Sequence, residues 1–136
     1  MRLIPAVLVL IFAAACSGND TAATTPTPTV TRTTDTFNGT APVGGSAFNT
    51  FTVAQAGQVD VTLTAAAPPA TITMGIGLGA PGDSRCVLFA GAVASTPAGS
   101  APQLSGTVSP ATLCVEVHDL GNQTAPVTYT VTVTHP

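Results

Sequence analysis

Apolar and polar residues alternate along much of the chain, and the alternation is clearest in residues 111–133. There, Leu113, Val115 and Val117 alternate with polar residues. After a loop rich in Gly, Asn and Pro, a second run alternates valines and a tyrosine with threonines. A period of two is typical of β-strands that bury one face. The pattern predicts a closing β-hairpin with one face in the core and the other in water.

Short runs of the same kind occupy the chain from Phe37 onward, separated by Gly and Pro, and none has the apolar period of a helix. This spacing is typical of antiparallel sandwiches. We predict an all-β fold, an antiparallel β-sandwich of about seven to eight strands with jelly-roll or Ig-like architecture. A second hairpin should join residues 51–53 to residues 59–64. The predicted core comprises Phe51, Val61, Leu63, Ile72, Met74, Leu104, Val115, Val117, Tyr129 and Val131.

Three glycines alternate with apolar residues in the segment TITMGIGLG. Ile76 and Leu78 are predicted to face inward, which leaves Gly75, Gly77 and Gly79 facing outward. Glycine weakens a strand because it has no side chain to pack. The row therefore predicts a bulge, a close backbone contact or a sheet edge.

The N-terminal region differs from the rest in composition. Residues 1–15 have one positive charge, an apolar run too short to cross a bilayer as a helix, and then three alanines, which predicts a signal peptide. Residues 16–36 are rich in Thr and Pro without a hydrophobic period and predict a disordered, flexible linker. Residues 37–136 are left for the β-sandwich domain.

The segment Ala13-Ala14-Ala15-Cys16 resembles the lipobox of bacterial lipoproteins, in which the cysteine is lipidated and becomes the first residue of the mature chain. The lipobox favours leucine where this chain has Ala13, so cleavage by an ordinary signal peptidase stays open as the alternative. A lipid on Cys16 would anchor the chain to a membrane. The expected location is the bacterial outer membrane or cell surface, and the periplasmic face stays open.

Three cysteines are an odd number for an exported protein. Lipidation of Cys16 would leave Cys86 and Cys114 as a disulfide pair in an oxidising compartment. The alternative is two buried free thiols. Because Cys114 shares the parity of Glu116 and His118, the predicted disulfide lies on the outer face or at a sheet edge.

Charged side chains are few: the chain has three arginines, six acids and no lysine. Its formal net charge is −3. Phosphate binding needs clustered Lys and Arg, which argues against nucleic acid as a partner. The hydrophobic share of 45% argues for a chain that folds.

Four residues form a candidate ligand or metal site: Glu116 and His118 share a strand face, and Asp119 and Asn122 lie in the following loop. Calcium takes six or more oxygen ligands and fewer are visible, so we expect no cofactor, with calcium as the alternative. The competing interpretation is that these are surface polar residues and that Asp119 caps a turn. Without a G-x-S-x-G motif, and with the neighbours His118 and Asp119 on opposite strand faces, we expect no enzyme.

The order of several motifs resembles the bacterial pre-peptidase C-terminal domain. The motifs are F-x-G at residues 37–39, F-T-V at residues 51–53, then VDVTL, CVEVHDLGN and YTVTV. The resemblance covers residues 37–136 and departs at residues 110–113, where the family commonly has Gly-x-Tyr. It implies a β-sandwich attached to secreted proteins that acts as an accessory or binding module and has no catalytic residues.

Two function classes follow from these expectations. The first is a non-catalytic, lipid-anchored binding or adhesion module of the cell envelope, whose loops at one end, including residues 119–125, contact a polysaccharide or a protein. The second is a structural or assembly lipoprotein that acts through its sheet edge or outer face. The sequence names no ligand and no oligomeric state.

Overall fold

The computed structural model describes residues 25–136, and every regular element in that range is a β-strand. The strands are β1 (Thr33–Ala41), β2 (Ser46–Val53), β3 (Gly57–Ala67), β4 (Met74–Pro81), β5 (Cys86–Thr96), β6 (Leu104–Val108), β7 (Ala111–His118) and β8 (Val127–His135). The predicted signal peptide and Cys16 lie outside the described residues. Within residues 25–136, no helix is long and apolar enough to cross a membrane.

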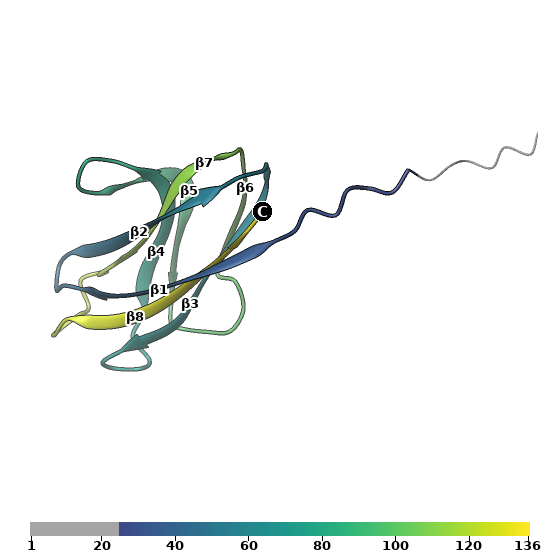
Figure 1. Ribbon diagram of the computed structural model, residues 1–136. Helices are drawn as coiled ribbons and strands as arrows, with labels where there is room; N and C mark the ends of the chain where they lie inside the picture. The colour runs from purple at the N-terminus through teal and green to yellow at the C-terminus, as the bar shows by residue number, and fades with distance from the viewer. Residues whose placement is uncertain (1–24) are drawn as a thin grey trace, which may run out of the picture.

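The strands form two four-stranded antiparallel sheets packed face to face (Figure 1). Sheet A has the order β1-β8-β3-β6, and sheet B has the order β2-β7-β4-β5. The eight strands in two sheets confirm the predicted all-β sandwich. Along the chain, each connection crosses from one sheet to the other except the one between β4 and β5.

Both predicted hairpins are wrong. β7 pairs with β2 and β4 in sheet B, whereas β8 pairs with β1 and β3 in sheet A. β2 and β3 are likewise in different sheets. Alternation assigns each residue to a face but does not name the partner strand. Residues 119–126 form a longer link than a two-residue hairpin turn, so the chain crosses between sheets and the apolar faces of β7 and β8 meet across the core.

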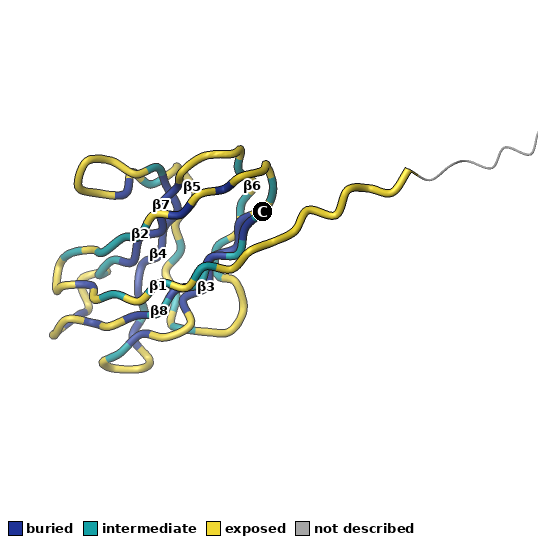
Figure 2. The backbone as a smooth tube through the Cα atoms, in the orientation of Figure 1, coloured by how far each residue is buried: buried dark blue, intermediate teal, exposed yellow. Residues whose placement is uncertain are grey.

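The buried hydrophobic residues form one core cluster with members from both sheets, and Figure 2 marks the buried positions of the strands in dark blue. All ten predicted core residues belong to this cluster, with Leu104 at its partly buried margin. Leu63, Met74, Val61, Val115 and Val131 have less than 2% of their surface exposed. The sequence parity therefore assigned the inner face correctly even where it mispaired the strands.

Two strands are longer than the sequence predicts. β5 continues beyond the predicted residues 86–89 to Thr96, and its register against β4 shifts between Gly77 and Gly79. Residues 89–92 stand opposite Leu78 alone, which makes this edge strand bulged. β1 begins at Thr33, so the end of the predicted linker forms part of an edge strand paired with β8.

Candidate functional site

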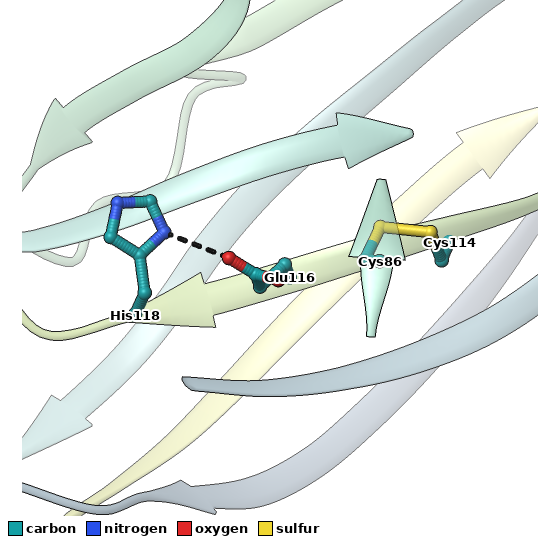
Figure 3. The surroundings of a disulfide bond; sticks show 4 residues. All are labelled: Cys86, Cys114, Glu116 and His118. Atoms are coloured by element: carbon teal, nitrogen blue, oxygen red, sulfur yellow. Dashed lines mark ion pairs between the residues drawn. A yellow bond between two sulfur atoms is a disulfide. The ribbon is translucent and has the colours of Figure 1, made fainter. Parts of the chain in front are cut away.

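The outer face of sheet B carries three side chains of β7 beside the glycines of β4. Cys114, Glu116 and His118 stand opposite Gly79, Gly77 and Gly75, respectively. They lie on the face away from the hydrophobic core cluster, which contains their neighbours in the strand. The structure therefore brings Glu116 and His118 together on one face, as predicted (Figure 3).

The three glycines are buried because neighbouring groups lie directly over them. The His118 ring covers Gly75, and the Val87 carbonyl covers Gly79. A Cβ built at Gly77 would lie 2.6 Å from Leu88 Cδ2. The predicted close contact and bulge are both present, but β4 is an interior strand and not an edge. Because the three glycines have no side chains, they leave a depression on the outer face, and residues of β5 and β7 occupy it.

A disulfide joins Cys86 of β5 to Cys114 of β7 (Figure 3). It connects two strands that lie on either side of β4 in sheet B. The two Cα atoms are 5.8 Å apart, and Cys114 is fully buried. The predicted pair is confirmed, and the free-thiol alternative is wrong. Burial on the outer face arises because Val87 and Leu88 of β5 lie over Gly79 and Gly77.

Glu116 and His118 form a close pair in this depression. His118 Nδ1 lies 3.3 Å from Glu116 Oε1, and the side chains are 22% and 12% exposed, respectively. Nδ1 is buried and makes no hydrogen bond to Oε1 or to another group of the described residues. The contact is therefore an ion pair when the imidazole is protonated, without the directional bond that would make it strong.

Asp119 caps a turn and does not join this pair. Its Oδ1 accepts hydrogen bonds from the backbone N–H groups of Gly121, Asn122 and Gln123, and its Oδ2 accepts one from Gly44 N–H at 2.7 Å. The bond from Gly44, together with the others, lowers the pKa of the Asp119 carboxyl. Both carboxylate oxygens therefore accept backbone hydrogen bonds, which hold the β7–β8 loop and connect it to the β1–β2 loop.

Asn122 ties the same loop to a third one, since its Nδ2 donates to the Thr73 carbonyl at 3.0 Å. The four predicted ligand residues therefore divide into an outer-face pair and a loop brace. Within residues 25–136, no group of three or more His, Cys, Asp or Glu side chains is arranged to hold a metal ion.

Residues 25–32, which we call the tether, leave the sandwich at one end, and the loops held by Asp119 lie at the other end. In Figure 1, the β1–β2 and β7–β8 loops are on the left, whereas residues 25–32 leave on the right. Val43 and Leu120, which flank the Gly44–Asp119 bond, are 52% and 43% exposed. We call Val43, Leu120 and the loops that carry them the distal loop end.

A second histidine–acid pair was not found from the sequence. His135 Nε2 lies 3.0 Å from Asp35 Oδ2, and the His135 ring centroid lies 5.2 Å from that of Phe51. His135 is only 5% exposed. The sequence did contain a signal for the burial of His135, because this residue has the same parity in β8 as the inward-facing Val131 and Val133. This pair closes the end of the core nearest the tether.

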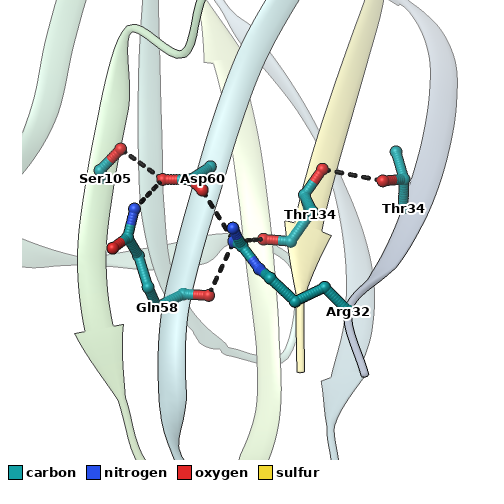
Figure 4. A network of polar contacts seen from close by, with 6 residues as sticks. All are labelled: Arg32, Thr34, Gln58, Asp60, Ser105 and Thr134. Atoms are coloured by element: carbon teal, nitrogen blue, oxygen red, sulfur yellow. Dashed lines mark hydrogen bonds and ion pairs between the residues drawn. The ribbon is translucent and has the colours of Figure 1, made fainter. Parts of the chain in front are cut away.

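A polar network at the tether junction was also missed (Figure 4). Arg32 Nη2 donates to Asp60 Oδ2 at 2.7 Å and to the carbonyls of Gln58 and Thr134 at 3.0 Å. Ser105 and Gln58 donate to Asp60 Oδ1. Hydrogen bonds from Ser105, Gln58 and then Arg32 lower the pKa of Asp60 to about 2. Nothing in the Thr-rich sequence around Arg32 indicates this partner.

The outer face of sheet A contains a shallow hollow of about 760 Å³. Asn38, Thr40, Thr64, Thr128 and Thr130 contribute polar groups to it, alongside several alanines, and no acidic or basic side chain lines it. Three of these hydroxyls are already bonded to the protein, to Asn38 Oδ1 and to two carbonyls. Few polar groups of the hollow are therefore left to bind a ligand or to take part in a reaction.

A scan against protein-family models finds no matching family, and a search of curated proteins finds no relative.

Proposed function

We propose that the protein is an exported, lipid-anchored, non-catalytic binding module of the bacterial cell envelope. The lipobox-like Cys16 supplies the anchor, and the Thr- and Pro-rich linker spaces the sandwich from the membrane. The resemblance to the pre-peptidase C-terminal domain supports an accessory role. A non-catalytic role also agrees with a sequence that has no G-x-S-x-G motif.

The observation that carries the proposal is the position of the distal loop end opposite the tether (Figure 1). A module held at one end presents its other end outward. Asp119 holds the loops there in one arrangement through backbone hydrogen bonds, which limits the entropy lost on binding. The exposed Val43 and Leu120 offer apolar area, with the polar residues Asp119 and Asn122 close by in the β7–β8 loop.

The test is crosslinking in cells that make the full lipidated chain, followed by identification of the crosslinked partner. We expect a defined envelope protein or polysaccharide that is captured by the native chain and lost in a Val43→Asp, Leu120→Asp variant. Both positions are exposed, so the variant should keep its melting temperature. A partner retained by this variant would contradict the proposal.

The second candidate is a structural or assembly lipoprotein that acts through a sheet edge. It is favoured by β5, an edge strand with no charged residue, in which Val87, Phe89 and Val93 are 48%, 41% and 46% exposed. Uncharged apolar edges are open to strand pairing. In the same crosslinking experiment, a Val87→Asp, Val93→Asp variant serves as the matched control. Loss of capture in this variant alone would favour assembly through β5.

A further inference from the structure

Several threonines of the sandwich bind other strands through their hydroxyls, and the threonines of the tether do not. In the strands, Thr34 bonds Thr134, Thr130 donates to Asn38, and Thr64 donates to a backbone carbonyl. These hydroxyls hold neighbouring strands together. They are therefore engaged once the domain has folded.

The tether threonines have no such partners. Thr25, Thr27, Thr29 and Thr31 are exposed, lie outside any strand, and make no side-chain hydrogen bond within residues 25–136. Figure 2 shows this segment exposed where it leaves the domain, and Figure 1 draws no strand over it. Each of these hydroxyls is free for reaction with an enzyme.

Proline keeps this segment extended. Pro26 and Pro28 alternate with the threonines, fix their own φ and push the preceding residue away from helical geometry. They also lack the N–H that a sheet would need. Thr- and Pro-rich stretches of this kind are the composition of O-glycosylated stalks.

Arg32 marks where the free segment ends. Its guanidinium binds the carboxylate of Asp60 and the carbonyl of Thr134, and the chain enters β1 at the next residue. Threonine hydroxyls thus lie on both sides of Arg32. Those in residues 25–31 are free, and those from Thr33 onward belong to a paired strand.

From these observations we infer that the tether is an O-glycosylation site that carries hexoses on Thr25, Thr27, Thr29 and Thr31. The donor is a hexose activated by a phosphate leaving group at C1. A transferase base takes the threonine proton, Oγ1 forms a bond to C1, and the bond from C1 to the phosphate oxygen breaks. The phosphate departs with the electron pair and receives the proton, and no oxidant or reductant is needed.

Mass spectrometry of the full-length protein from its own cells tests the site. After reduction and denaturation, trypsin cuts after Arg32 and Arg85, which separates the tether from the peptide of residues 33–85. We expect mass increments of whole hexose residues on the tether peptide and none on residues 33–85. An unmodified tether peptide, or hexoses on Thr33, Thr34 or Thr36, overturns the inference.

A variant sharpens the assignment. Replacing Thr25, Thr27, Thr29 and Thr31 by valine leaves Arg32 and every strand intact, so the melting temperature should stay the same. The hexose increments should disappear. A Thr36→Val variant is the matched control and should keep all of them. Increments that persist in the fourfold variant would overturn the assignment to these residues.

Discussion

The outer faces of the two sheets are built in opposite ways from the same alternation. On sheet A, threonines of β1 stand opposite threonines of β8, as in the pairs Thr34–Thr134 and Thr36–Thr132, and remain in contact with water. On sheet B, the glycine row admits a buried disulfide, the partly buried Leu88 and the Glu116–His118 pair as a second layer. An outward residue is therefore not always a solvated one. The difference predicts that substitutions on sheet B cost more stability than substitutions on sheet A.

The largest effect should come from removing the disulfide. Replacing Cys86 and Cys114 by alanine frees a loop with a sequence separation of 28 residues. The chain-entropy model gives a loss of about 3 to 4 kcal/mol in the free energy of unfolding. Urea denaturation of the variant and the oxidised protein measures the difference. A loss below about 1 kcal/mol would show that the buried layer on sheet B does not depend on the crosslink.

A methyl group at Gly79 should come next. Its Cβ would meet the Val87 carbonyl and the Leu88 Cα, and backbone atoms cannot swing aside as a flexible side chain can. We expect Gly79→Ala to lower the free energy of unfolding by about 2 to 3 kcal/mol.

The matched control for Gly79→Ala is Gly106→Ala on β6 of sheet A. A Cβ there meets nothing within 4 Å. This change should be neutral or stabilise by up to about 0.5 kcal/mol, because alanine has less backbone freedom to lose. Equal melting temperatures for the two variants would show that the β5 backbone over Gly79 does not oppose a Cβ there.

Asp60 gives sheet A a pH-dependent contribution to stability. Its pKa falls from 3.8 to about 2 on folding, and its side chain is 11% exposed. A lowered pKa means that the contribution is complete above about pH 4 and is lost as pH falls through about pH 2. We expect it to amount to about 1 to 2 kcal/mol.

Chemical denaturation between pH 5 and pH 2, run on the native chain and Asp60→Asn, measures this contribution. The stability gap between the two proteins should narrow as the pH falls. A gap that stays constant over this range would mean that the carboxylate charge is not what Arg32, Gln58 and Ser105 stabilise.

The smallest effect should come from Thr34→Val. The hydroxyl bond between Thr34 and Thr134 is 2.8 Å long but exposed, so water replaces it readily. Valine also has high β-propensity. The expected change in the free energy of unfolding is within about 0.5 kcal/mol, measured by thermal denaturation. A larger loss would indicate that the threonine pairs of sheet A act as a network.

Much of the fold was predictable because local alternation follows from burial. Val115, Val117, Tyr129 and Val131 face inward as their parity requires. The turn cap at Asp119 was also foreseen as the alternative to a ligand site, because aspartate readily accepts backbone N–H bonds.

The candidate site was less predictable because its partners are distant in sequence. Arg32 and Asp60 are separated by 28 positions, and Asp35 and His135 by 100. No local pattern links such residues. The hairpin prediction failed for the same reason, since two alternating strands joined by a loop can pair side by side or face each other across a core.

By itself, the sequence determined the strand content, the inner face, the cysteine pair and the position of the glycine row, because each depends on side-chain chemistry and on spacing along the chain. The tertiary structure alone decided which strands pair, since backbone hydrogen bonds are nearly the same for every partner. It also decided that Cys114 and Glu116 on the outer face of sheet B are buried, because residues of β5 lie over Gly79 and Gly77. The distal loop end and the Arg32 junction likewise exist only once the two sheets pack.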